Sequence, residues 1–145
     1  RAGRGDRPGE AVVQTLYPDH YSITFACQQD YHGFAARELE FRRAMRYPPF
    51  VALVNVVVRA AHERAAYDIA NRIAEGLRGR QGLGRFEVLG PAPAPLERLK
   101  GEHRVQLFLK GSDRRAMRQS LASVLGAVGA AGRFVTVDVD PVNVL

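Results

Sequence analysis

The chain has 145 residues, a hydrophobic content of 46% and a formal net charge of +6 at pH 7. That hydrophobic content argues against wholesale disorder and is enough for the core of one ordinary domain with some chain to spare. The positive charge comes almost entirely from Arg, and it favours nucleic acid or an acidic protein over a cationic partner.

The cysteine content and the hydropathy exclude further classes. Cys27 is the only cysteine, so the sequence holds neither an internal disulfide nor a zinc site built from cysteines. No apolar run is long enough to span a membrane and no signal peptide is recognisable, so we expect a cytoplasmic protein. Because the chain lacks an initiator Met and opens abruptly with RAGRGDRPGE, we interpret it as a piece of a larger protein.

The N-terminal stretch predicts a loop, a short strand and a turn. Residues 1–9 are rich in Gly and Arg, so little there can pack and we expect a loop. An apolar run over residues 11–16 predicts a strand, and Pro18 followed by Asp19 predicts a turn. Residues 20–27 fit either a strand or the start of a helix.

A helix is predicted over residues 30–46. Asp30 is a favourable N-cap, and Glu38 lies one turn before Arg42, where the two side chains can pair. The helix has to end before Pro48–Pro49, because a residue that precedes proline avoids the α-helical conformation. These two prolines are the clearest boundary in the chain.

The rest of the chain alternates between strand and helix patterns. Four segments have the composition or the alternation of strands: residues 51–58, 86–89, 104–110 and 134–139. Two segments carry apolar residues at helical spacing, the first at residues 62–78 and the second after Ser112 or Asp113, either of which can cap it. In the last strand the side chains predicted to face the core are those of Val135, Val137 and Val139.

This β-α-β-β-α-β order predicts an α+β, ferredoxin-like fold. In such a fold a four-stranded antiparallel sheet carries both helices on one face. Right-handed crossovers place the first and third strands in the middle of the sheet.

The connection before the third strand, together with that strand, carries candidate anion contacts. Prolines that lack an amide donor predict an irregular loop there: Pro91, Pro93 and Pro95. Arg98 and Lys100 lie in this loop, and the alternation of the third strand places Arg104, Phe108 and Lys110 on one face. Positive charge and one aromatic ring on an open strand face suggest a surface that meets polyanions, although a solvated sheet face explains the same pattern.

Two other classes share features with this sequence. An RNA-recognition module has the same order of elements, but its third strand needs Gly and several aromatics, and here Phe108 is the single aromatic. Asp138 and Asp140 project from one strand face and suit a divalent cation in a nucleotidyl-transfer enzyme, although no third acidic residue supports them. No complete phosphate-binding loop or nucleophile motif is present, so no catalytic residue is assigned.

Four stretches of the chain match a known pattern in the right order. DYHGFAARELEFRRAMRYPPF is similar to D-Y-x-x-F-x-x-R-E-L-x-x-R-R-x-x-x-Y-P-P-F, and VLGPAPAPLERLKGEHRVQLFLK is similar to G-P-x-P-A-P-x-x-x-x-x-G-x-x-R-x-Q-x-x-x-K. The terminal VDVDP is also typical, and the opening RAGR looks like the end of the helicase motif Q-x-x-G-R-A-G-R. Together these stretches resemble the primosomal protein N′ (PriA) family of bacterial replication-restart helicases.

The resemblance implies two parts, residues 1–46 as the tail of the second helicase lobe and residues 47–145 as a C-terminal domain. In such a protein Arg1 and Arg4 reach the nucleotide phosphates. The chain lacks the family's P-loop, acidic metal-binding motif and zinc-binding cysteines, so we expect this fragment to bind neither ATP nor zinc. The resemblance implies ATP, Mg and Zn for the parent protein, as an ATP-dependent 3′-to-5′ DNA helicase.

The resemblance also implies partners for the C-terminal domain, and a place in the cytoplasm at the nucleoid. It would bind branched or forked DNA, the acidic tail of single-stranded-DNA-binding protein and other primosome proteins. Arg114 and Arg118, near the start of the last helix, match the positions that grip this tail in the family. Position 118 is Arg here, whereas some relatives carry an amide.

Overall fold

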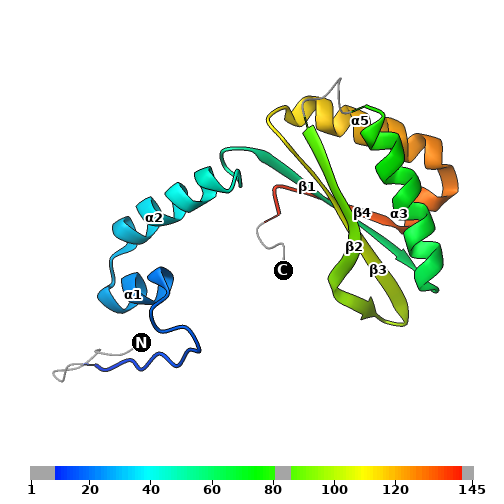
Figure 1. Ribbon diagram of the computed structural model, residues 1–145. Helices are drawn as coiled ribbons and strands as arrows, with labels where there is room; N and C mark the ends of the chain where they lie inside the picture. Colours follow the sequence, from blue (N-terminus) through cyan, green and yellow to red (C-terminus); the bar gives the residue numbers. More distant parts are fainter. Residues whose placement is uncertain (1–8, 81–85, 142–145) are drawn as a thin grey trace. The chain divides into compact units, whose positions relative to one another are not determined.

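The structure is a computed structural model that describes residues 9–80 and 86–141 (Figure 1). The chain divides into two compact units, Arg1–Met45 and Arg46–Leu145. The described part of the first unit holds helices α1 (Tyr21–Gln28) and α2 (Tyr31–Ala44). The second unit holds, in order, β1 (Ala52–Ala60), α3 (Glu63–Arg78), β2 (Phe86–Leu99), β3 (Glu102–Gly111), α5 (Arg114–Val128), η1 (Gly129–Phe134) and β4 (Val135–Val139).

Helix α2 begins where its capping residue predicts. The Asp30 carboxylate accepts a hydrogen bond from the Gly33 N–H at 2.9 Å, which satisfies one of the amides left free at a helix start. The predicted pair one turn apart is also confirmed, since Arg42 Nε lies 2.6 Å from a carboxylate oxygen of Glu38. Local sequence therefore suffices to specify this helix.

Residues 20–27, which fitted either a strand or a helix, lie almost entirely in helix α1. The side chain of His20 accepts a hydrogen bond from the Ser22 N–H and caps the helix. Tyr21 donates a hydrogen bond to the Glu38 carboxylate and so joins α1 to α2. Within residues 9–45 every side chain is at least partly exposed, so the described part of this unit contains no buried core.

The predicted strand over residues 11–16 is wrong. These residues form no regular secondary structure and end in a bend at Leu16, and the predicted turn at Pro18 and Asp19 follows. Val12 and Leu16 are 88% and 90% exposed. A strand needs a neighbour that accepts its hydrogen bonds and covers alternate side chains, and none of the described strands pairs with this segment.

The strands of the second unit form one antiparallel sheet in the order β2-β3-β1-β4. Strands β1 and β3 are central, which confirms the predicted ferredoxin-like arrangement. Helices α3 and α5 lie together on one face of this sheet (Figure 1). Because side chains alternate along each strand, the other face is not covered by these helices, and we call it the open face.

The core lies between the two helices and the sheet. Its members without exposed surface come from both helices and both central strands: Val56, Val58, Ala66, Ala70, Ile73, Ala74, Leu77, Leu107, Leu109 and Met117. The Asp113 carboxylate caps α5 by accepting a hydrogen bond from the Ala116 N–H at 2.9 Å, which decides between the two predicted caps. No helix in the described ranges combines the length and the apolar character that crossing a membrane requires.

The predicted irregular loop after residue 89 is wrong, because β2 continues through the three prolines to Leu99. β2 is an edge strand, where a missing N–H need not cost a ladder hydrogen bond. Two register shifts against β3 accompany the prolines, between Leu89 and Ala92 and between Pro93 and Arg98. The result is a long hairpin in place of two short strands and a loop.

Three residues of this hairpin have the positive φ angles that glycine favours. Gly90 has φ +92°, and a Cβ atom there would lie 3.0 Å from the Gln106 carbonyl oxygen. The tight turn at the tip holds Lys100 at φ 52° and Gly101 at φ 84°.

The three valines of β4 lie on the predicted face of the sheet, but two of them are not buried there. Val137 and Val139 lie opposite Val56 and Val54, on the face that carries the helices, but are 38% and 44% exposed. β4 is an edge strand, and α3 and α5 cover the other three strands. Val135 alone packs against the core.

Candidate nucleic-acid interface

The open face carries the third-strand residues that were predicted to meet DNA. Residues buried beneath the helices alternate along β3 with half-buried ones, which confirms the predicted alternation. The half-buried residues at positions 104 to 110 are Arg104, Gln106, Phe108 and Lys110. Their partners across β1 are, in the same order, Arg59, Val57, Asn55 and Leu53.

Five side chains surround a hollow of about 310 Å³ on the open face: Tyr47, Leu53, Leu89, Phe108 and Lys110. Leu53 is buried at 4% exposure, whereas Leu89 is 44% exposed. The Lys110 ammonium nitrogen lies 4.8 Å from the centre of the Tyr47 ring, within the range of a cation–π contact. The hollow is therefore apolar and has one cation among the side chains that line it.

Arg59 and Arg104 face each other farther along the open face, across β1 and β3. Arg59 Nη1 lies 3.9 Å from a Glu102 carboxylate oxygen, and Arg104 Nη1 donates to the Leu96 carbonyl at 3.4 Å. The Nε atoms of both side chains are sealed from solvent and find no acceptor among the described residues. Like charges directly opposite one another destabilise a strand pair, so an anion at the exposed ends of these two side chains is favoured.

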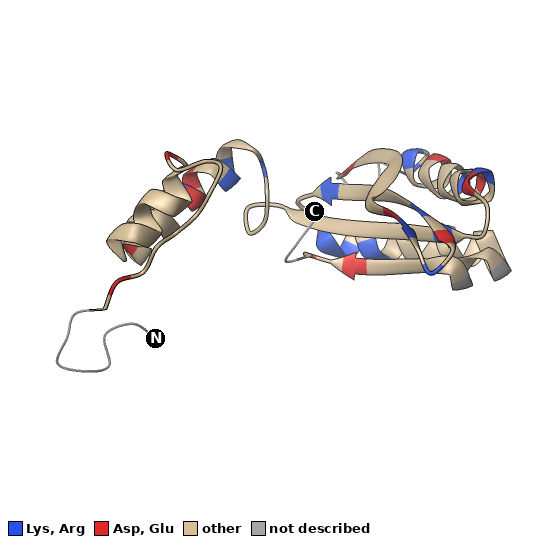
Figure 2. Ribbon diagram, turned by 90° about the horizontal axis from the view of Figure 1, so that it is seen from below, with Lys and Arg blue, Asp and Glu red and all other residues tan. Residues whose placement is uncertain are grey.

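The predicted DNA contacts do not form a single cluster. Arg104, Phe108 and Lys110 lie along the open face, and Lys100 is exposed in the turn at the hairpin tip. Arg98 lies opposite His103, which places it on the other face of the hairpin. Figure 2 shows Lys and Arg interspersed with Asp and Glu along the strands and helices of the C-terminal unit.

Sequence reasoning found Phe108 and Lys110 but missed Arg59 and the other members of the hollow, Tyr47, Leu53 and Leu89. The strand at residues 51–58 is apolar on both faces, since Leu53 and Val57 on the open face are 4% and 9% exposed. A signal was present in the polar residues that interrupt this run, Asn55 and Arg59, which are separated by two full strand periods. That spacing identifies the open face of a buried strand.

The start of α5 holds the two residues predicted to bind an acidic peptide. Arg114 Nε donates to Asp140 Oδ2 at 3.0 Å, and Asp140 Oδ1 accepts the Leu53 N–H at 3.0 Å. Arg118 is exposed one turn farther on and forms no ion pair with another described residue. Free amides and the helix dipole favour an anion at this end of the helix.

The contacts of Asp140 shift its pKa. Burial raises the pKa of this carboxyl, but the Leu53 N–H and the Arg114 guanidinium outweigh burial and hold the pKa below its usual value. Because the pKa is lower in the folded state than in the unfolded state, these contacts stabilise the fold fully at pH values above the unfolded-state pKa. This contribution is lost as the pH falls through the folded pKa.

We therefore expect the difference in Tm between the parent chain and Asp140→Asn to be largest near neutral pH and to close as the pH falls below about 4. Circular dichroism melts between neutral and strongly acidic pH measure this difference. Asp138→Asn, which changes an exposed carboxyl two residues earlier on β4, is the matched control and should give a smaller difference. A difference for Asp140→Asn that stays constant over the whole range would contradict the assigned pairing.

Asp138 and Asp140 do not present two open carboxylates. Both oxygens of Asp140 accept hydrogen bonds, from Leu53 and from Arg114, and its backbone lies in the left-handed region at φ 50°. In residues 9–80 and 86–141 no three His, Cys, Asp or Glu side chains come together in a way that could hold a metal ion. Asp140 thus serves to join the end of β4 to the start of α5.

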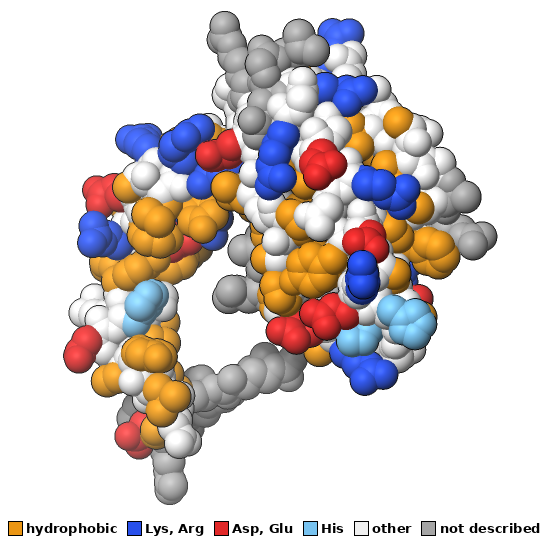
Figure 3. Space-filling view, turned by 45° about the vertical axis from the view of Figure 1, so that its right-hand side comes forward, with side chains coloured by type: hydrophobic (Ala, Val, Ile, Leu, Met, Phe, Trp, Pro, Cys, Tyr) orange, Lys and Arg blue, Asp and Glu red, His pale blue; other side chains and the backbone are white. Residues whose placement is uncertain are grey.

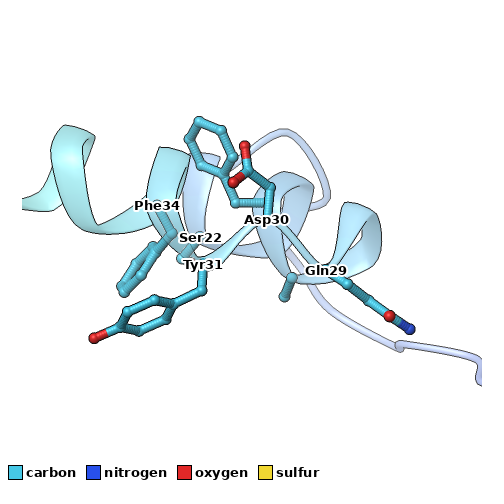
Figure 4. Close-up of a pocket in the computed structure, with 7 residues that line it drawn as sticks. Ser22, Gln29, Asp30, Tyr31 and Phe34 are labelled. Carbon is cyan, nitrogen blue, oxygen red and sulfur yellow. The ribbon is translucent and has the colours of Figure 1, made fainter.

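A second hollow, of about 340 Å³, lies between α1 and α2. Its lining is mostly apolar: Ser22, Phe25, Ala26, Gln29, Asp30, Tyr31 and Phe34. Figure 4 shows the rings of Tyr31 and Phe34 pointing to the same side, away from the Asp30 carboxylate that caps α2. Hydrophobic side chains also gather over the surface of this helical unit (Figure 3). The unit therefore offers apolar surface and no cluster of charged groups around this hollow.

Arg1 and Arg4, the candidate nucleotide-phosphate contacts, lie outside the described residues.

The fold and the open face together define a class of protein, a ferredoxin-like α+β domain whose uncovered sheet face combines cationic and aromatic side chains. A family model described as the primosomal protein N C-terminal domain matches residues 43–142. The chain belongs to this family.

Curated relatives are named replication restart protein PriA. The relative from Treponema pallidum is 38% identical over 146 positions, which cover 100% of this chain and 22% of that protein. Those from Haemophilus influenzae and Bacillus subtilis are 36% and 34% identical and cover 83% and 86% of this chain, but only 16% and 15% of their own lengths. The chain thus spans between 15% and 22% of these relatives. Among solved structures, a de novo designed protein has a TM-score of 0.45 at 17% identity, covering 61% of this chain and 92% of its own.

Proposed function

We propose that the chain supplies the C-terminal DNA-binding and protein-docking domain of a bacterial replication-restart helicase. The observation that carries this proposal is the shared position of Arg104, Phe108 and Lys110 on a sheet face that the helices leave uncovered. Membership of the family supports it. The DNA partner that we propose is a branched or forked structure, because the family's relatives are named for replication restart.

The remaining functions of such a helicase belong to other parts of the parent protein. We propose that ATP hydrolysis with Mg and a zinc site lie there, and that Arg1 and Arg4 contribute to the nucleotide site when that part is present. Within residues 9–80 and 86–141 the structure offers no carboxylate cluster for a metal ion. The proposed location is the cytoplasm, at the nucleoid, with other primosome proteins as partners.

The DNA contacts that we propose are mainly to phosphates, so binding should weaken steeply as salt rises. We expect the triple change Lys100→Ala, Arg104→Ala and Lys110→Ala to lower the slope of log affinity against log salt by roughly two to three. Fluorescence anisotropy with a forked oligonucleotide over a range of NaCl concentrations measures this slope.

A triple variant with the same loss of charge serves as control. Arg64, Arg72 and Arg115 are exposed residues of α3 and α5, the helices that cover the other face of the sheet. Their replacement by Ala should leave the slope close to that of the parent chain. Equal reductions in both triple variants would show that only total charge matters and would remove the open face as the DNA site.

The second docking site that we propose is the start of α5, for the acidic C-terminal tail of single-stranded-DNA-binding protein. Arg114 and Arg118 lie one turn apart there, and a guanidinium can hold a carboxylate through two hydrogen bonds. Asp140 already occupies Arg114 Nε, which leaves the Nη groups of Arg114 and the whole guanidinium of Arg118 for a ligand.

A further inference from the structure

We propose that the hollow on the open face holds one unpaired nucleobase, stacked on Phe108, with its phosphate at Lys110 and the strand continuing toward Arg59 and Arg104. This inference rests on the proposed DNA-binding function and narrows it to an unpaired strand. Neither the family membership nor the phosphate contacts proposed above imply that a base touches this chain.

The shape and lining of the hollow suit a flat ring. Its volume of about 310 Å³ is at the small end of the range for ligand pockets, enough for one planar group and too small for the face of a helix. Phe108 and Tyr47 supply aromatic surface, while Leu53 and Leu89 supply aliphatic surface. Bases of any sequence stack on such side chains, because every base has a π-face.

The charges around the hollow favour a phosphate beside that ring. Lys110 is the one charged side chain among the residues that line it, and its ammonium nitrogen is 4.8 Å from the Tyr47 ring centre. Glu87 lies directly opposite Lys110 on β2, and its carboxylate is 3.9 Å from Arg46, while Glu102 lies 3.9 Å from Arg59, so an arginine stands beside each of these carboxylates. Asp138, an exposed carboxylate on β4, lies opposite Asn55 and repels any anion on its side, which leaves the Lys110 side of the hollow for the phosphate.

The positions along β3 set a direction for the strand. Lys110 and Arg104 are six residues apart, which corresponds to about 20 Å in an extended strand, and Phe108 lies between them. Arg59 stands opposite Arg104, so the far end of this path carries two guanidinium groups. A single strand that runs along β3 therefore meets a cation, an aromatic hollow and a cation pair in succession.

A duplex cannot make the same contacts, because its bases are stacked on one another and paired. Only an unpaired base can enter the hollow without the cost of unstacking. The open face is therefore expected to prefer the single-stranded arm of a forked DNA to its duplex arms.

The test uses the whole chain and fluorescein-labelled single-stranded DNA of roughly ten nucleotides, which is within the usual range of site sizes. We expect Phe108→Ala to lower the affinity for this strand about tenfold. The same change should leave the affinity for an abasic strand of equal length and for a duplex unchanged. Phe108→Leu, which keeps an apolar side chain at this half-buried position, should lower the affinity in the same direction, and Phe108→Tyr should retain it.

Val137→Ala is the matched control, since Val137 is an apolar side chain that is 38% exposed on the opposite face of the same sheet. It should leave the affinities for all three DNA ligands unchanged. If Phe108→Ala instead weakens the base-containing and abasic strands equally, the ring does not hold a base and the inference is overturned.

Other outcomes separate this inference from the proposed function. Loss of affinity on neutralising Arg104 and Lys110, with no effect of Phe108→Ala on any strand, overturns the base site and leaves phosphate binding intact. Failure of the parent chain to bind any DNA overturns both. An RNA of the same sequence that binds tenfold more tightly, or an acidic peptide that displaces the DNA and depends on Phe108, assigns the hollow to another ligand and also overturns the inference.

Discussion

Replacement of Ile73 by Ala is expected to lower the free energy of unfolding of the C-terminal unit by about 2–5 kcal/mol. Ile73 has no exposed surface and belongs to the core formed by α3, α5 and the sheet. The change removes buried methyl and methylene groups and leaves a cavity that close-packed neighbours cannot fill completely. Urea denaturation followed by circular dichroism at 222 nm, a wavelength that reports the helices, measures the loss.

Ile69→Ala provides the comparison, because it is the same chemical change one helical turn earlier at a position that is only partly buried. The loss should be clearly smaller there, since solvent already reaches part of the side chain. Equal losses at the two positions would mean that α3 does not turn the side that carries Ile73 toward the sheet. The open face would then lose its basis as well, because the side of the sheet that the helices cover defines it.

Local chemistry could be predicted from the sequence where it depends on neighbours in the chain. Asp30 and Asp113 cap their helices through amides three residues away, and the burial of alternate residues on β3 follows from its period of two. These features need no knowledge of which strand lies beside which. The β-α-β-β-α-β order then restricts the topology, because crossovers are right-handed and the two helices need one shared face.

Features that depend on position in the sheet could not be predicted in the same way. The prolines of β2 indicated a loop because their missing amides would break a central ladder, whereas at an edge they are tolerated. Val137 and Val139 have the alternation of a covered strand but lie on an edge strand and stay 38% and 44% exposed. The apolar run at residues 11–16 pairs with none of the described strands. Each of these predictions was wrong because it assumed a neighbouring strand or helix that is not found beside the segment among the described residues.

The candidate sites likewise combine features that follow from local sequence with features that depend on long-range pairing. The open-face positions of Arg104, Phe108 and Lys110 followed from alternation alone, but Arg59 belongs to the same surface only through the pairing of β1 with β3. The contact of Asp140 with Arg114 joins residues 26 apart in sequence and depends on where β4 ends. Long-range pairing therefore changed the interpretation of the peptide site, which contains an acidic group of its own.

The double change Arg114→Ala and Arg118→Ala is expected to abolish binding of an acidic C-terminal peptide to this chain. Each charged hydrogen bond to a docked carboxylate contributes on the order of 1.5–3 kcal/mol, so the loss of both exceeds the modest affinity expected for an exposed site. Tm should change little, because the side chains of Arg114 and Asp140 are 52% and 32% exposed and such ion pairs add little stability. Isothermal titration calorimetry with the peptide and with its C-terminally amidated form measures the effect.

Two further variants make this test specific to the start of α5. Arg64→Ala with Arg72→Ala removes the same charge from exposed positions of α3, and it should leave peptide binding intact. Asp140→Asn should tighten binding, because it removes a negative charge that lies 3.0 Å from Arg114 and repels an incoming carboxylate. Unchanged affinity in the Arg114 and Arg118 double variant would place the peptide elsewhere on the chain, even with the family membership and the DNA-binding face intact.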